Sequence, residues 1–478
     1  MFKNAKVIAF FTLISRVLGY IRDVLIASHF GVSIYTDMFF IAFRIPNSLR
    51  RFLGEGAVNS SVVPVLSRID EKDKPVAIWN VIVVFGFVLL VVSVLGVVFS
   101  KALVAVFAGG YLRGEHSSLM NSMVRITFPY IFFIGLTVLL MGILNTYKHF
   151  AVAAFAPSLL NISLIAFVFF ADRFSNPVYA LCVGVIVGGL LQLIVSFFDF
   201  LSLRIPPKIS FRIEDSTRQI FSLMGITALG SGVMQISSMV DSFVASFLPY
   251  GSFSYIFYAN RLFQLPFAVF SIAITQSSLP DLSKLKKTEL IKAITLLLRF
   301  VVFVSIAVEM YFFFFSEDVV GLLFRHGRFS DLDTSNTALT LKIMIAGFLF
   351  FSIAKILSNA FYSFEDAKTP LRASVFSSFV AIVASVALGF SLGFVGLAIS
   401  MSLSGLVNAS VLWFYADRSI GRMRIADIVD SLCLVEFVVL LVVSVALVRL
   451  NFGFLAALVF YGGFALYGFR HYSALESR

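Results

Sequence analysis

Two neighbouring apolar stretches near the start of the chain carry charged side chains at regular spacing. The first reads SRVLGYIRDVLIASHFG at 15–31, and the second reads TDMFFIAFRIPNSLRRFLGEGA at 36–57. Both are apolar enough to be membrane helices, yet an Arg or Asp at the centre of a lone membrane helix costs about 2.5–3.5 kcal/mol. Together these residues cost roughly 10 kcal/mol, which partners, water or a ligand must offset.

Helical spacing places the charges of the first stretch in rows. Positions seven apart nearly eclipse on a helix of 3.6 residues per turn. Ser15 therefore lies over Arg22 and Arg16 over Asp23, with Gly19 between the two rows. We expect this polar stripe to face a hydrated cavity rather than lipid.

The second stretch repeats the pattern. Asp37, Arg44 and Arg51 form one row, and Asn47 lies beside it. A proline, Pro46, falls within the same helix and is expected to bend it. The two stripes together predict a shared cavity with a cationic lining.

The excess of arginine in these stretches indicates that the ligand of the cavity is an anion. A second interpretation pairs the charges only with one another, Arg16 with Asp23 and Asp37 with Arg44. The arginines, however, outnumber the carboxylates: Arg16, Arg22, Arg44, Arg50 and Arg51 stand against Asp23, Asp37 and Glu55. The planar guanidinium matches phosphate oxygens, often two at once. A phosphate-bearing amphiphile therefore fits better than a metal ion or a proton alone.

The composition defines the class of protein. Of the 478 residues, 59% are hydrophobic and only 13% are charged. Repeated apolar stretches of roughly 20 residues indicate an all-α polytopic membrane protein. The net charge of +11 is explained by basic cytoplasmic loops, so we expect no nucleic-acid partner.

Fourteen spans are predicted along the chain: 5–30, 35–67, 76–107, 119–147, 152–171, 177–203, 216–248, 252–282, 289–316, 335–363, 369–390, 394–415, 427–448 and 452–470. Lys and Arg gather in the loops at one end of these spans, from Lys3 and Lys6 to Arg470. By the positive-inside rule that end is cytoplasmic, and so are both termini.

An internal repeat divides the chain into lobes. The stretch at 15–31 resembles 237–251, the stretch at 44–68 resembles 261–284, and 145–157 resembles 359–370. The same order on the same side predicts two parallel six-helix lobes, 1–212 and 213–417, related by an axis along the membrane normal. Residues 418–478 form an extra helix pair outside the repeat.

The repeat adds residues from the second lobe to the cavity. Asp241 corresponds to Asp23, and Arg261 corresponds to Arg44. Gln264 shares a helix face with Arg261 at i, i+3, and Pro266 just beyond is expected to bend that helix. We therefore add Asp241, as a candidate coupling residue, with Arg261 and Gln264.

Catalytic signatures are absent from the sequence. The five histidines are scattered, with no H-x-x-x-H or Cys/His cluster, so no metal site is expected. No P-loop is present, and we assign no catalytic residue or cofactor. Two other functions stay open: a MATE-like exporter of small molecules, disfavoured for cationic cargo by the arginines, and a membrane enzyme acting on polyprenyl phosphates.

Several motifs resemble the MurJ (MviN) family of lipid II flippases, in the superfamily that includes the MATE exporters. They are SRVLGYIRD at 15–23, TDMFFIAFRIPN at 36–47, SLRRFLGEGA at 48–57 and ANRLFQLP at 259–266. The resemblance extends over essentially the whole chain. It implies that lipid II, the undecaprenyl-pyrophosphate precursor of peptidoglycan, moves from the cytoplasmic to the periplasmic leaflet of a bacterial inner membrane by alternating access. Cell-wall biogenesis and cell shape would depend on it.

The family's functional positions, carried onto this sequence, fall on Ser15, Arg16, Arg22, Asp23, Asp37, Asn47, Arg50, Arg51, Glu55 and Arg261. The resemblance also implies that the extra helix pair is a groove for the lipid tail, and that the protein is a monomer that meets membrane lipids and cell-wall synthases. We expect Arg16, Arg22, Arg51 and Arg261 to hold the pyrophosphate, while Asp23, Asp37 and Glu55 tune them.

One departure concerns energy coupling. Some relatives are thought to use sodium, with acidic or amide ligands on the seventh and eleventh helices. Asp241 is present, but residues 373–389 (ASVFSSFVAIVASVALG) contain no carboxylate or amide. Sodium coupling is therefore not expected, and membrane potential or protons remain as energy sources.

Overall fold

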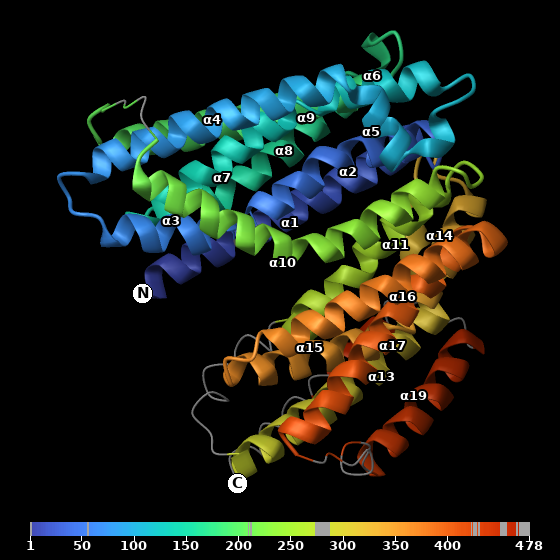
Figure 1. Ribbon diagram of the computed structural model, residues 1–478. Coiled ribbons are helices and arrows are strands. Elements are labelled where there is room, and N and C mark those ends of the chain that lie inside the picture. Colours follow the sequence, from blue (N-terminus) through green and yellow to red (C-terminus); the bar gives the residue numbers. More distant parts are fainter. Residues whose placement is uncertain are drawn as a thin grey trace. The chain divides into compact units, whose positions relative to one another are not determined.

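The computed structural model is helical throughout the part of the chain that it describes (Figure 1). That part comprises residues 2–54, 57–208, 210, 213–272, 287–421, 423, 428, 431–449, 457–464 and 467. It forms two compact units, Met1–Phe253 with Gly327–Phe329, and Ser254–His326 with Ser330–Arg478. Each unit is described by itself below.

The helices of the first unit follow one another with short connections. They are α1 (Phe2–Phe30), α2 (Ile34–Gly54), α3 (Ala57–Arg68), α4 (Lys74–Val98), α5 (Ser100–Phe107), η1 (Gly109–Tyr111), α6 (Ser117–Thr127), α7 (Tyr130–Thr146), α8 (Ala151–Phe169), η2 (Ala171–Arg173), α9 (Val178–Ser202) and α10 (Asp215–Ala245). Helix α8 packs against both α1 and α9, and α10 packs against α3 and α2. The compact unit therefore includes α10, which the repeat assigns to the second lobe.

A short segment from the middle of the chain completes the first unit. The N–H of Arg328 donates to the carbonyl of Ser28 near the end of α1, at 2.7 Å. A side chain at Gly327 would lie 2.3 Å from the same carbonyl, and the φ of Gly327 is +60°. Only glycine allows the backbone to approach so closely in that conformation.

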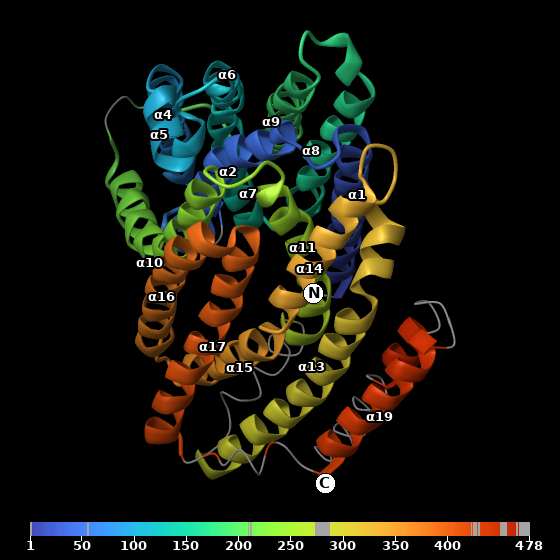
Figure 2. The same ribbon diagram turned by 90° about the vertical axis from the view of Figure 1, so that its right-hand side faces the viewer.

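The second unit continues with α11 (Ser252–Pro266), which starts at the end of the first. It is followed by the π-helical turn η3 (Phe267–Ile272), then α13 (Lys287–Phe324), α14 (Asp331–Ile345), α15 (Phe348–Ser363), α16 (Lys368–Leu392), α17 (Phe394–Ser419) and α19 (Ser431–Arg449). Helices α16 and α17 pack together, and α19 packs beside α13 (Figure 2).

Seven described helical segments are long and apolar enough to cross a membrane, or eight if the bent pair α14 and α15 is one span. Helices α1 and α2 are not among them. This differs from the expectation that both are apolar enough to be membrane helices, and the charges that they carry are the reason. The chain is thus an all-helical, multi-pass membrane protein. Glycines bring its helices close together, as where Gly188 of α9 meets Leu160 of α8, which is common in membrane helix packing.

The helix positions agree closely with those expected from hydropathy, with two kinds of difference. The stretch 76–107 is interrupted at Phe99, between α4 and α5, and 335–363 is bent between α14 and α15. Residues 55 and 56, within the stretch 35–67, lie outside the described residues. Helix α2 continues through Pro46, whereas α11 ends at Pro266 and gives way to η3. The predicted span 452–470 lies largely outside the described residues, as do residues 273–282 of the eighth span.

Candidate functional site

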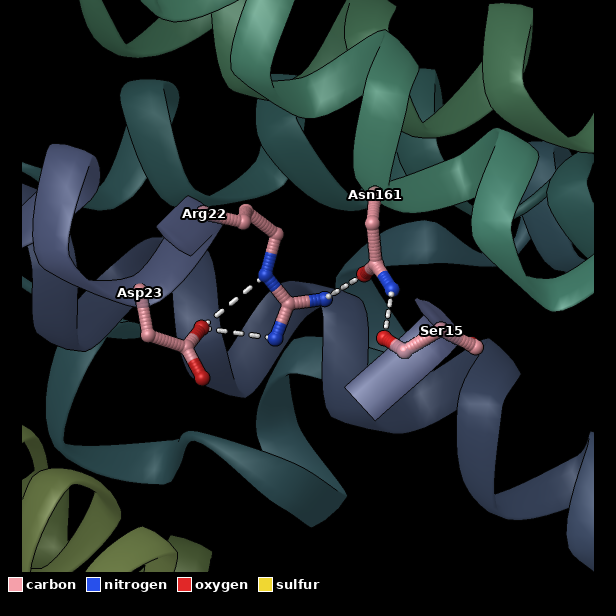
Figure 3. Close-up of polar contacts among 4 residues, drawn as sticks. All are labelled: Ser15, Arg22, Asp23 and Asn161. Atoms are coloured by element: carbon pink, nitrogen blue, oxygen red, sulfur yellow. Dashed lines mark hydrogen bonds and ion pairs between the residues drawn. The ribbon is translucent and has the colours of Figure 1, made fainter. Parts of the chain in front are cut away.

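Arg22 is the centre of a buried polar network in the first unit (Figure 3). Its Nε and Nη2 atoms both donate to Oδ1 of Asp23, at 2.9 and 2.6 Å, and Nη1 donates to Oδ1 of Asn161 at 2.9 Å. The side chains of Arg22 and Asp23 are only 8% and 2% exposed. The guanidinium is therefore neutralised and fixed in orientation by its partners.

Asn161 joins this network from α8, and the sequence reasoning did not identify it. Its Nδ2 donates to the carbonyl of Ser15 at 3.0 Å, so one amide connects both ends of the row Ser15–Arg22 (Figure 3). Gly19 lies between them, and a Cβ there would lie 3.4 Å from Asn161 Nδ2. The signal available in the sequence was a single amide within the apolar helix AVAAFAPSLLNISLIAFVF.

Arg16 differs from Arg22 in its surroundings. Its side chain is exposed, and it makes no hydrogen bond or ion pair with another described residue. Asp23 pairs with Arg22 instead of the Arg16 that the pairing interpretation required. Within the first unit, Arg16 is therefore a cation available to an anion.

The predicted row on α2 contacts the far end of α10. The fully buried carboxylate of Asp37 accepts the N–H of Gly251 at 2.6 Å. Arg44 donates to Oγ of Ser242 at 2.9 Å and lies over the ring of Phe253, 5.1 Å from its centroid. Two residues of one helical row thus hold the end of α10 and the turn that follows it.

Beyond Pro46 the second helix carries another polar pair. Arg50 donates through Nε to Oδ1 of Asn47 at 2.9 Å. The two side chains are one helical turn apart, so the pair is local to α2.

The remaining predicted site residues are placed less completely. Arg51 lies in α2, but its side chain is outside the described residues, and Glu55 is outside them altogether. Asp241 is half-buried in α10 of the first unit. In the second unit, Arg261 lies over the ring of Phe257 at 4.9 Å, and Gln264 is exposed. Among the described residues no group of three His, Cys, Asp or Glu side chains could hold a metal ion.

In a multi-pass helical membrane protein, charged side chains within the first helices are typical of a pathway for a polar or charged substrate. A family model described as Lipid II flippase MurJ matches residues 26–467. A probable lipid II flippase MurJ of Buchnera aphidicola from Acyrthosiphon pisum is 34% identical over 451 residues, covering 92% of this chain and 86% of the relative. The lipid II flippase MurJ of Burkholderia cenocepacia is 34% identical over 428 residues, covering 86% and 83%.

Solved structures agree. A structure described as lipid II flippase MurJ in an inward closed conformation aligns with a TM-score of 0.85 and 27% identity, covering 98% of this chain and 99% of that one. An inward-facing MATE family multidrug transporter aligns with a TM-score of 0.67 and 15% identity, over 85% and 94% of the two chains, which shows a shared fold. The chain therefore belongs to the MurJ lipid II flippase family, whose members are transporters and not enzymes.

Proposed function

We propose that this protein flips lipid II from the cytoplasmic to the periplasmic leaflet by alternating access. The observation that carries the proposal is the match of residues 26–467 to the flippase family, combined with arginines in the first two helices that lipid would reject. Lipid II carries a pyrophosphate, and guanidinium groups suit its oxygens.

The contacts of each arginine suggest different roles in binding. Arg16 is exposed and without a described partner, so it is the first candidate to touch the pyrophosphate. Arg22, held by Asp23 and Asn161, positions α1 rather than binding freely. Arg50, Arg51 and Arg261 are further candidates for the phosphate. Asp23, Asp37 and Glu55 would tune or release them during the cycle.

The architecture that we propose for transport has fourteen spans and both termini in the cytoplasm. Two parallel lobes, 1–212 and 213–417, would move against each other around the arginines. The extra pair in 418–478 would hold the lipid tail. We propose that a monomer completes the cycle, driven by membrane potential or protons rather than sodium, and passes its cargo to cell-wall synthases.

A leaflet-resolved lipid II accessibility assay tests the proposal. We expect wild-type protein in proteoliposomes to move lipid II across the bilayer, and Arg16→Gln to weaken binding. Losing one charge-assisted hydrogen bond of about 1.5–3 kcal/mol lowers affinity roughly 10- to 100-fold. Arg173→Gln removes an exposed arginine in η2 and is the matched control. Wild-type protein that leaves lipid II in its original leaflet would contradict the function, and an unaffected Arg16→Gln variant would contradict the assigned contact.

A further inference from the structure

The span formed by α14 and α15 is broken inside the second unit. The two helices are bent by 41° at the residues between Ile345 and Phe348. A side chain at Gly347 would lie 2.9 Å from Cα of Ser402, because α17 approaches the break closely. The break is therefore fixed by close packing and not by a loose connection.

A break inside a membrane leaves backbone groups that must find partners, since lipid offers none. Two side chains supply them here. Oγ of Ser402 donates to the carbonyl of Ile343 at 2.7 Å, on the α14 side. The carboxylate of Glu309, from α13, accepts the N–H of Leu349 at 2.9 Å, on the α15 side. The hydroxyl carries no charge, whereas the carboxyl group does so only when it has lost its proton.

Glu309 lies within the apolar span Glu289–Phe324, where an ionisable group is costly and indicates function. It shares a cavity of about 210 Å³ with Lys342 of α14 and with Phe437 of α19. Other walls of the cavity are apolar. An acidic and a basic residue thus line one small, otherwise apolar space.

Helices α6 and α7 offer a comparison within the described part of the chain. They follow each other in one span, Ser117–Thr146, and Pro129 immediately precedes the first residue of α7. Proline has no N–H to satisfy, so its helix start needs no acceptor at that position. At α15 the acceptor is required, and an uncharged side chain would have served. A titratable acceptor at this position calls for a further explanation.

We propose that Glu309 is a proton-binding site, and that taking up a proton loosens its hold on the N-terminus of α15 and so changes the bend between α14 and α15. As a carboxylate, Glu309 holds the positive end of the α15 dipole, and Lys342 in the lining of the same cavity favours this charged form. As a neutral acid it is a weaker acceptor, and the N-terminus of α15 is released. The step is a simple protonation, with no electron transfer.

The chemistry of the cavity favours a proton over a metal cation. Sodium needs several oxygen ligands, and among the described residues that line the cavity Glu309 has the one carboxylate, while Lys342 is a cationic residue of the same lining. Helix α13 packs against α14, α15, α19 and η3. The other charged residues of α14, α15 and α19 whose side chains the structure describes are not in the lining of the cavity: Asp331, Asp333, Lys355 and Glu436.

Infrared titration of the purified full-length protein tests proton binding directly. Because Glu436 of α19 is also buried, the band of Glu309 is taken from the difference between the wild type and Glu309→Gln. We expect the wild type to show a carbonyl band of protonated Glu309 that disappears as the pH rises, and Glu309→Gln to lack that band. The amide keeps an acceptor for Leu349, so the fold is expected to persist. Glu317→Gln, an exposed position on the same helix, should leave the band in place. A band that survives in Glu309→Gln would overturn the proposal.

Lys342→Met provides a second variant that tests the shared cavity. Without the ammonium the neutral acid is favoured, so the midpoint of the infrared titration should move to higher pH. A merely structural lysine would leave that midpoint unchanged, and such a result would overturn the assignment of the two groups to one site. This variant also keeps the test valid if Glu309→Gln does not fold.

A role of this proton in transport rests on the proposed lipid II flipping. In proteoliposomes we expect the flipping rate of the wild type to depend on pH and that of Glu309→Gln to lose this dependence. Unchanged pH dependence in the variant would overturn the coupling. If the wild type moves no lipid II, the proposed function fails, whereas the infrared result still decides whether Glu309 binds a proton.

Discussion

At the scale of residues, the charged helices contain both fixed and available arginines. Arg22 is buried against Asp23 and Asn161, and Arg16 is exposed. Burying a charge pair is costly, but removing one partner costs more, since the other charge is then left uncompensated. Arg16 and Arg22 thus lie on the same helix but differ in role: Arg22 is held by partners, and Arg16 is available to a ligand.

Asp23→Asn should destabilise the protein by about 3 kcal/mol, because it leaves the Arg22 guanidinium buried without a counter-charge. Combining it with Arg22→Gln should recover part of the loss. Thermal unfolding of the purified protein in detergent measures both. Arg16→Gln, at an exposed position, should change stability by no more than about 0.5 kcal/mol. A double variant less stable than Asp23→Asn would argue against the pair.

Sequence reasoning found these charges but not their partners. Asn161 contacts both Ser15 and Arg22 of the predicted row, Ser15 through its backbone carbonyl and Arg22 through its guanidinium. The row spacing could not find Asn161, 139 residues from Arg22, because a lone amide in an apolar helix has no periodicity. Glu309 was missed for the same reason. Its partner is a backbone N–H, which the side-chain pattern of a sequence does not reveal.

At the scale of elements, close helix contacts depend on glycine at particular positions. On α4, a Cβ at Gly96 would lie 1.9 Å from Cε1 of the buried Phe128, whereas a Cβ at Gly86 would lie 3.4 Å from Leu136. The first contact requires repacking of a buried ring, and the second is almost ordinary van der Waals contact. The two glycines of one helix thus differ in what they permit.

Gly96→Ala should therefore destabilise the protein by about 1–3 kcal/mol, the usual cost of overpacking. Gly86→Ala should be neutral or stabilising by up to about 1 kcal/mol, because alanine favours a helix over glycine. Chemical denaturation in mild detergent compares the two. Equal effects of both substitutions would contradict the packing of α4 against Phe128.

The start of α16 is fixed by a carboxylate outside the membrane spans. Oδ2 of Asp366 accepts the Thr369 hydroxyl at 2.6 Å, and Oδ1 accepts the N–H groups of Lys368 and Thr369, both at 3.0 Å. These hydrogen bonds, that of the Thr369 hydroxyl first, lower the pKa of Asp366 from its ordinary value. Because its pKa is lower in the folded state, its contribution to stability is complete above the ordinary Asp value and is lost as the pH falls through the folded-state pKa.

Asp366→Ala should cost about 1 kcal/mol at neutral pH, the usual value of a helix cap. The side chain is largely solvated, which keeps the effect small. The difference from the wild type should shrink below roughly pH 4, where the wild-type carboxyl group also protonates. Thermal unfolding at neutral and acidic pH measures the difference in stability between the wild type and Asp366→Ala. Glu317→Ala, at an exposed position, is the control. A difference that stays constant with pH would contradict the charged cap.

At the scale of the whole molecule, hydropathy located nearly every helix that the structure describes. It could not locate the interruption between α4 and α5 or the bend between α14 and α15. Both sides of each interruption are equally apolar in pattern, and the ends are decided by packing and backbone hydrogen bonds. The internal repeat likewise could not show that α10 packs within the first unit. Sequence similarity between two stretches does not tell which helices are in contact.

Loop charge predicts that both termini are cytoplasmic. A fluorescent protein that folds only in the cytoplasm should therefore be fluorescent when it is fused to the C-terminus. A single cysteine replacing Arg113, in an exposed loop after η1, should react with a membrane-impermeant reagent added outside the cell. A cysteine replacing Lys72, in the exposed loop before α4, should be protected. The reversed pattern of labelling would overturn the orientation.

The hydrogen bonds of Asp37 and Arg44 on α2 to the end of α10 and the turn after it have a consequence for how the protein is made. Asp37 and Gly251 are 214 residues apart, and Arg44 and Ser242 are 198 apart. At about 5–20 residues per second of synthesis, α2 precedes these partners from the ribosome by roughly 10–40 seconds. Asp37 and Arg44 must therefore enter the bilayer before their partners have been synthesised. These partners are the backbone N–H of Gly251 and the hydroxyl of Ser242. A nascent chain released before residue 242 would lack both attachments.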